Sequence, residues 1–263
     1  MMGRLWAIGL NTFREAARIR VLYGILMLVI GVNLLAIVLG EMSIHEQARV
    51  ARDAGLAGIS LFGSLTAIFL GVFLLYSEVQ RRTIYAIVTK PIARWEFVVG
   101  KYLGMVLVLS VLVALFSAAM LALLTWQGVA LSSAIGKAVV LAWCEVLTVA
   151  AIAVFFSAFS SPFLSGIFAL ALFAIGRVTP DLRAAASTAD ASWIRTVSSA
   201  TLEIVPDLHL FAISGRSVDG VAASVHGDYV SWGYVAAAAG HGLFWIAALL
   251  VLACVIFQRR DFV

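Results

Sequence analysis

The stretch YLGMVLVLSVLVALFSAAMLALLTW, residues 102–126, decides the fold of this chain. It carries no charged side chain from one end to the other. As an α-helix, at about 1.5 Å per residue, it would be roughly 37 Å long. The hydrocarbon layer of a bilayer is about 30 Å thick and needs about 20 apolar residues to cross it. The stretch therefore predicts a transmembrane helix with room to tilt.

Similar apolar stretches lie on both sides of this one. They cover, to within a few residues, 21–40, 56–77, 138–157, 162–177 and 234–257. A single helix through 138–176 would overshoot any bilayer, and the serines before Pro162 predict a tight turn there. The span 162–177 is short, and we interpret Arg177 as snorkelling from its end to the interface. We expect an all-α integral membrane protein with about six spans in one transmembrane domain.

The composition differs from that of a soluble globular protein. The chain has 263 residues, of which 63% are hydrophobic and 12% charged. Soluble domains are about 45–50% apolar and about 25% charged. The basic residues flank the apolar stretches, whereas a nucleic-acid-binding protein would gather them with aromatics on a soluble face. We expect the bilayer, and no nucleic acid, as a partner.

The distribution of lysine and arginine predicts the orientation in the membrane. Basic residues before the first span and between the second and third are Arg4, Arg14, Arg18, Arg20, Arg81, Arg82, Lys90, Arg94 and Lys101. The short connections on the other side have only Arg49, Arg52 and Lys137. Cytoplasmic loops carry the excess of positive charge. Both termini and the 78–101 loop should therefore be cytoplasmic, and the long 178–233 segment extracytoplasmic, in a cell membrane such as a bacterial inner membrane.

Residues 1–20 form a different kind of segment. Trp6 and Phe13 alternate with arginines such as Arg14 and Arg18, a mixture typical of a helix lying in the membrane interface. The simpler interpretation is a membrane anchor. The other is an elbow helix that leads into the first span and touches a cytoplasmic partner.

The 178–233 segment contains one helical pattern. Trp193, Val197, Ala200 and Ile204 recur at helical spacing, and Pro206 would end that helix. The helix could lie on the outer leaflet, cover the pathway or dock an external partner. Lying on the membrane is the simplest of these.

The sequence lacks the patterns of catalysis. No stretch has both the glycines and the lysine of a P-loop; Gly136-Lys137-Ala138 lacks the upstream glycine. The four histidines are not spaced with cysteine or carboxylate ligands for a metal. We expect no catalytic residue, no metal site, no bound cofactor and no enzymatic activity on this chain.

Glu145 is a carboxylate well inside a predicted span. Such a charge is costly in a membrane and usually faces the bundle interior or water. It could contact a substrate or an ion. It could equally be structural, with Thr148 one turn on, or an arginine from the external segment, as its partner.

The most informative stretch runs from Glu78 to Lys101. An acid and two arginines open it, an apolar face follows at Ile84 and Ile87, and Pro91 divides it into two short amphipathic pieces. Small residues at Gly100 and Gly104 then begin the third span, as at packed helix interfaces.

Here the chain resembles the permease subunits of ABC-2 type ABC transporters, most of which are exporters. The resemblance rests on Glu78, Arg82-Thr83-Ile84, Pro91-Ile92-Ala93-Arg94, Gly100-Lys101 and the closing Phe257-Gln-Arg-Arg-Asp-Phe262. The six-span layout and the amphipathic start agree with it.

The resemblance implies a coupling helix in the 78–101 loop, seated on a separate cytoplasmic ATP-binding subunit that holds ATP and Mg. It also implies a second permease copy or homologue in the working unit. By charge and position, the residues expected at the ATPase interface are Arg81, Arg82, Lys90, Pro91, Arg94 and Glu96, with Glu78 bracing the loop. The substrate is not readable from the sequence.

Two other classes of function remain. A self-standing channel or ion-coupled transporter would be expected to show several intramembrane charges or repeated broken helices. A membrane scaffold would recruit proteins and move nothing. Co-purification with an ATPase would separate the permease from both.

Overall fold

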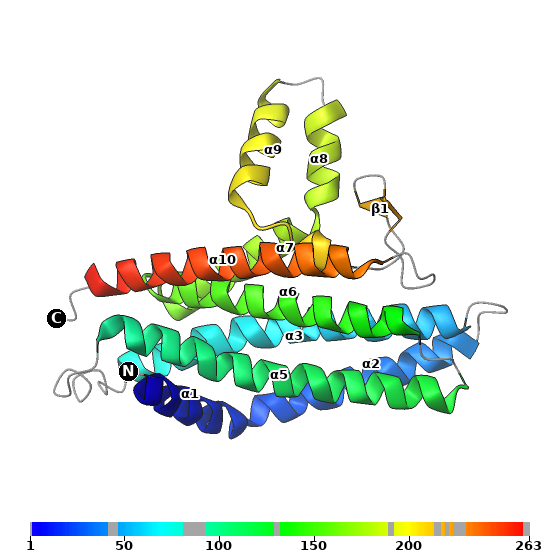
Figure 1. Cartoon of the computed structure of the whole chain (residues 1–263), viewed down its shortest axis with the longest axis horizontal. Coiled ribbons are helices and arrows are strands. Elements are labelled where there is room, and N and C mark those ends of the chain that lie inside the picture. The colour runs from blue at the N-terminus through cyan, green and yellow to red at the C-terminus, as the bar shows by residue number, and fades with distance from the viewer. Residues whose placement is uncertain are drawn as a thin grey trace.

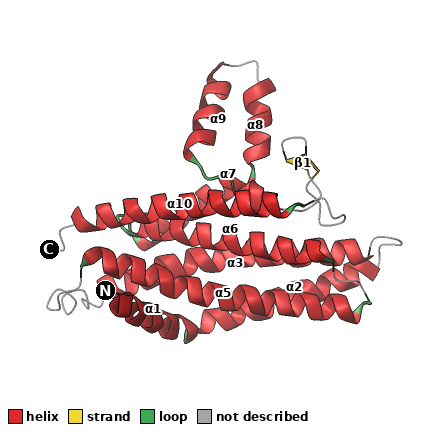
Figure 2. Ribbon diagram, in the orientation of Figure 1, coloured by secondary structure: helices red, strands yellow, loops and turns green. Residues whose placement is uncertain are grey.

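The computed structural model describes residues 2–41, 47–80, 93–128, 132–188, 192–212, 217–218, 221–222 and 230–259. Helices account for almost all of them, which confirms the all-α prediction (Figure 2). In this part of the chain the strands, β1 (Ser217–Val218) and β2 (Val221–Ala222), form one two-residue antiparallel ladder.

The long helices form a bundle with parallel and antiparallel neighbours (Figure 1). They are α2 (Arg20–Glu41), α3 (Gln47–Gln80), α5 (Arg94–Trp126), α6 (Ser133–Ser157), α7 (Pro162–Arg177) and α10 (Trp232–Arg259). The first and last described residues of the chain lie at the same end of the bundle. We call this the terminal end, and the other the far end.

Helix α6 occupies the centre of the bundle. It packs against α3, α5, α7 and α10, and every residue from Glu145 to Val154 is buried. Small side chains such as Ala150, Ala151 and Ala153 let the neighbours approach closely, as is usual between membrane helices.

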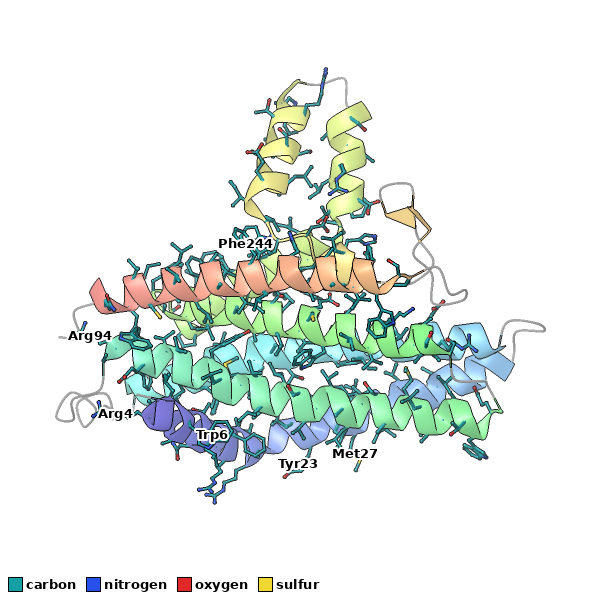
Figure 3. All side chains as sticks on the ribbon, viewed as in Figure 1. Arg4, Trp6, Tyr23, Met27, Arg94 and Phe244 are labelled. Atoms are coloured by element: carbon teal, nitrogen blue, oxygen red, sulfur yellow. The ribbon has the colours of Figure 1, made fainter. Side chains whose placement is uncertain are left out.

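The outside of the bundle is apolar. Tyr23 and Met27 of α2 and Phe244 of α10 are exposed and point away from the other helices (Figure 3). Because water would not tolerate so much exposed apolar surface, this side is built to face lipid.

Four helices contain segments long and apolar enough to cross a membrane: Arg52–Leu74 in α3, α5, α6 and Trp232–Gln258 in α10. The bent pair α7–α8 adds a fifth if it counts as one span. In α2, the segment Leu22–Val32 is apolar but shorter. The chain is thus a multi-pass membrane protein, and the number of six spans stays a prediction.

Several helices begin earlier than the apolar stretches. Helix α3 begins at Gln47 rather than near 56, α5 at Arg94 rather than at 102, and α6 at Ser133 rather than at 138. The predicted 78–101 loop is therefore helical at both of its ends. Hydropathy detects the part of a helix that lies in lipid, and a helix can continue into the polar interface.

The amphipathic segment near the N-terminus forms α1 (Met2–Ala17). It packs along α5, where Gly100 faces Ile8 and Gly104 faces Thr12. A side-chain carbon added at Gly100 would lie 2.7 Å from Ile8 Cγ2, so the glycines are what allow this contact. The membrane-anchor and elbow interpretations of α1 both stay predictions.

The segment between α7 and α10 leaves the bundle and returns to it. A bend of 61° at Val178 separates α7 from α8 (Thr179–Thr188), and α8 pairs with α9 (Ser192–Ile204) in a hairpin that projects across the bundle axis (Figure 1). The chain then re-enters the bundle as the 3-10 turn η1 (Leu208–Phe211). The sequence predicted α9 and its end before Pro206, but not α8.

Candidate functional site

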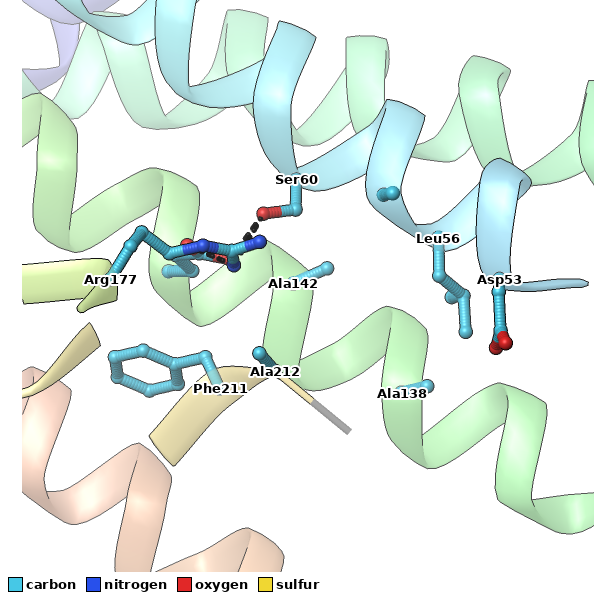
Figure 4. A pocket seen from close by; sticks show the side chains of 10 residues that line it. Asp53, Leu56, Ser60, Ala138, Ala142, Arg177, Phe211 and Ala212 are labelled. Carbon is cyan, nitrogen blue, oxygen red and sulfur yellow. Dashed lines mark hydrogen bonds and ion pairs between the residues drawn. The ribbon is translucent and has the colours of Figure 1, made fainter. Parts of the chain in front are cut away.

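The cluster around Glu145 joins three helices inside the bundle. Glu145 lies at the midpoint of α6 and is fully buried. Its Oε1 accepts from Arg177 Nη1 at 2.8 Å, and its Oε2 accepts from Ser60 Oγ at 2.6 Å. The same Nη1 also lies 3.0 Å from Ser60 Oγ (Figure 4). Residues of α3, α6 and α7 thus form one polar network.

This network stabilises the buried carboxylate of Glu145. A carboxylate without a partner inside a membrane bundle would be strongly unfavourable, whereas an arginine and a hydroxyl satisfy both of its oxygens. The snorkelling interpretation of Arg177 was wrong, because its guanidinium turns inward and donates to Glu145.

Thr148 is not the partner of Glu145. Its Oγ1 donates to the carbonyl oxygen of Cys144 within α6, at 2.9 Å. Of the structural alternatives considered for Glu145, the arginine is the one present. This arginine, Arg177, is the last residue of α7 and directly precedes the 178–233 segment.

A cavity of about 300 Å³ opens beside the cluster (Figure 4). Asp53 and Ser60 of α3, and Glu145 with Arg177, provide its polar lining. The apolar lining consists of Leu56, Ala57, Ala138, Ala142, Phe211 and Ala212. Small apolar walls with a few convergent polar groups are typical of ligand sites, and this volume is at the lower end of their range.

The turn η1 closes one side of this cavity. Leu208 and Phe211 are buried against α6 and α7. Gly176 of α7 and Gly242 of α10 face them: a side-chain carbon on Gly176 would lie 2.8 Å from the carbonyl oxygen of Pro206, and one on Gly242 would lie 3.0 Å from Phe211. We call the surface that receives η1, with Gly176 and Gly242, the seat of η1. The sequence did not predict it, since η1 has no periodicity of its own.

The predicted coupling residues are described only in part. Arg81, Arg82, Lys90 and Pro91 lie outside the described residues, as does the side chain of Glu78 at the end of α3. Arg94 is exposed, and its Nη1 donates to the carbonyl oxygen of Gln258 in α10 at 2.9 Å.

Glu96 is buried at the start of α5. Its Oε2 accepts from the backbone N–H of Ala93 at 3.2 Å, which caps the helix that it belongs to. The side chains of two predicted coupling residues, Arg94 and Glu96, are described. Of these, only Arg94 is exposed and accessible to a partner subunit.

The first turns of α5 connect two other helices. The rings of Phe97 and Phe257 stack with their centroids 5.9 Å apart, which joins α5 to α10. Lys101 forms an ion pair with Glu15 at 3.3 Å, which joins α5 to α1. Arg94 and Arg4 lie at this terminal end of the bundle (Figure 3).

Within the described ranges, no three histidine, cysteine or acidic side chains are placed to hold a metal ion. Cys144 and Cys254 are both free thiols.

Comparison with known proteins identifies the family of the chain. Curated proteins gave no match to the chain. A family model described as "ABC-2 family transporter protein" matches residues 6–262, which is nearly the whole length. A match of that extent includes the bundle, the Glu145 cluster and the first turns of α5. The chain belongs to the ABC-2 family of transporter proteins and is a transporter permease of the membrane.

Proposed function

We propose that this permease couples ATP hydrolysis on a separate cytoplasmic subunit to movement of a substrate across the membrane, in the direction of export. Family membership supports a partnership with an ATP-binding subunit in a membrane. We place the contact with that subunit on the 78–101 segment, at the terminal end of the bundle, and we expect a second permease copy or homologue beside this one.

The observation that carries the proposal is the position of the first turns of α5. Residues 94–101 are the last, helical part of the predicted 78–101 coupling segment, and they contact α1 through Lys101 and α10 through Arg94 and Phe97. A force applied to the segment by a closing ATPase would therefore reach three helices at once.

Helix α3 supplies a second route, because its last three residues, 78–80, begin the same segment. It is continuous from Gln47 to Gln80 and carries Ser60 of the Glu145 cluster. Twenty residues separate Ser60 from Gln80, so about 30 Å of rigid helix connects the coupling segment with the cavity. ATP binding could thus shift Ser60 relative to Glu145 and Arg177.

Arg94 allows a direct test of the coupling. Arg94→Glu should abolish the stimulation of ATPase activity when the permease is reconstituted with its co-purified ATP-binding subunit, since the arginine fork pairs with carboxylates. Arg94→Lys keeps the positive charge but loses the fork, and should keep only part of the stimulation. Arg4→Glu changes an exposed charge at the same end and serves as the control.

Normal stimulation by a stably inserted Arg94→Glu protein would contradict the assignment of Arg94. If no protein with a P-loop co-purifies with the chain from its native membrane, the ATP-driven function itself is contradicted. The cavity at Glu145 would then be the first place to look for channel or ion-coupled activity.

A further inference from the structure

Helix α9 carries an apolar stripe that no described residue covers. Trp193, Val197 and Ile204 are 68%, 57% and 72% exposed. With Ala200 they lie at positions i, i+4, i+7 and i+11, which places them on one face of the helix. Helix α9 contacts α8 through another face, where Ser198 is buried.

The rest of the exposed surface of α9 is polar. Arg195, Ser199 and Glu203 follow one another at intervals of four residues, well away from the apolar stripe around the helix. A helix with a narrow apolar face and a charged face is the kind that lies in the boundary between lipid and water.

The length of α7 sets the depth at which the hairpin leaves the bundle. Helix α7 has 16 residues and rises about 24 Å, less than the roughly 30 Å of a hydrocarbon layer. It begins at the terminal end, after the turn that follows α6. With the start of α7 at the near edge of the hydrocarbon layer, the bend at Val178 would lie in the leaflet remote from the termini, before the far surface is reached.

From that bend the hairpin extends across the bundle axis, and hence along the plane of the membrane (Figure 1). A charged helix at this depth would be costly in pure hydrocarbon, but in the boundary region it can bury one face and hydrate the other.

We propose that α9 lies in the leaflet remote from the termini, with Trp193, Val197 and Ile204 among the acyl chains and Arg195, Ser199 and Glu203 toward water. Tryptophan at one end of the stripe suits the headgroup region, where its ring is enriched in membrane proteins.

Lipid fits this face better than a second copy of the chain. The stripe consists of four side chains, whereas a specific protein interface buries about 800 Å² on each partner. The stripe also extends an existing lipid surface, since Phe244 is exposed on the side of α10 from which the hairpin rises (Figure 3). Lipid would then hold the bend at a constant depth and keep Arg177 level with Glu145.

Depth-dependent quenching tests the proposal. A single cysteine is placed at Val197→Cys, at Ile204→Cys, or at Ser199→Cys as the matched control on the polar face, in a chain carrying Cys144→Ser and Cys254→Ser. Each is labelled with a nitrobenzoxadiazole probe and reconstituted in phosphatidylcholine vesicles whose acyl chains are brominated. All three positions lie on the surface of α9, so the thermal transitions should agree.

We expect bromine to quench the probes at 197 and 204 at least about twofold more strongly than the probe at 199. Equal quenching at all three positions would overturn the proposal, because α9 would then have no lipid-facing side. Probes at 197 and 204 shielded from bromine would also overturn it, and disulfide formation between two Val197→Cys copies would identify a second chain as the occupant.

Discussion

Lys101 of α5 is only 1% exposed, and its Nζ lies 3.3 Å from Oε2 of Glu15 in α1. The same ammonium lies 5.8 Å from the centroid of the Phe97 ring. A cation held between these groups makes the position of α1 depend on α5, at the last residue of the predicted 78–101 coupling segment.

Exchanging both charges of the Lys101–Glu15 ion pair should restore the stability that reversing one charge removes. We expect Lys101→Glu to lower the free energy of unfolding by about 1–2 kcal/mol, since it places two carboxylates together at a site with one partly exposed partner. The double variant Lys101→Glu with Glu15→Lys should recover most of the loss. Thermal unfolding of the purified protein measures both, with exposed Arg14→Glu as the control. No recovery in the double variant would contradict the pairing.

The Glu145 network predicts a difference between breaking the pair and deleting it. Glu145→Ala leaves the Arg177 guanidinium without its carboxylate and should cost about 3 kcal/mol of stability. Glu145→Leu combined with Arg177→Met removes both charges and should regain most of that stability, because apolar replacements of a buried pair are often neutral. Thermal unfolding in detergent compares the variants.

A transport assay of the same double variant distinguishes a structural role of Glu145 from a role in substrate contact. If the cluster contacts substrate, the stable double variant should fail to transport. Thr148→Val is the control, because its hydroxyl bonds only the backbone of its own helix among the described contacts. A stable double variant with full transport would show that Glu145 is structural.

Two glycines of α10 form a matched pair for testing the seat of η1. A side-chain carbon at Gly242 would lie 3.0 Å from Phe211 and 3.1 Å from Thr148 Oγ1, whereas one at Gly240 would meet nothing within 4 Å. We expect Gly242→Ala to destabilise the protein by about 1–3 kcal/mol through overpacking. Gly240→Ala should be neutral or slightly stabilising in the helix. Equal melting temperatures for the two variants would argue against a tight seat.

Lys137 should hold the first turn of α10 in place. Its Nζ donates to the carbonyl oxygen of Val230 at 2.7 Å and lies 5.5 Å from the centroid of the Trp232 ring. Lys137→Met removes both interactions and should cost about 1–2 kcal/mol locally. Hydrogen exchange of the amides from Trp232 to Val235 should become faster, while exchange in the middle of α10 stays unchanged. Lys137→Arg, which keeps a charged donor, is the control.

The sequence predicted those helices that are indicated by residues within the helix itself or directly beside it. The apolar run before Arg177 and the serines before Pro162 indicate a helix over 162–177, and α7 has those bounds. The spacing of Trp193, Val197 and Ile204 indicates α9 for the same reason. Helix α8 was missed, although its early Pro180 and its alanines at 184–186 are both compatible with a helix.

The partners of the intramembrane groups could not be predicted in the same way. An arginine at the end of a span can snorkel to the interface or turn inward, and its own sequence does not distinguish the two. The choice depends on Ser60 and Glu145, which lie 117 and 32 positions away along the chain. Similarly, Gly100 and Gly104 indicated close packing, but not that α1 is the helix packed there.

The seat of η1 also sets an order of assembly during synthesis. Leu208 and Phe211 are buried partly by α6 and α7, which are made before them, and partly by α10, which is made after them. Until Gly242 has emerged and α10 has inserted, the Pro206–Ala212 turn has only part of its binding surface. The cavity beside Glu145 should therefore acquire its wall late in biogenesis. In a nascent chain arrested before α10, the Pro206–Ala212 turn should therefore be accessible to protease.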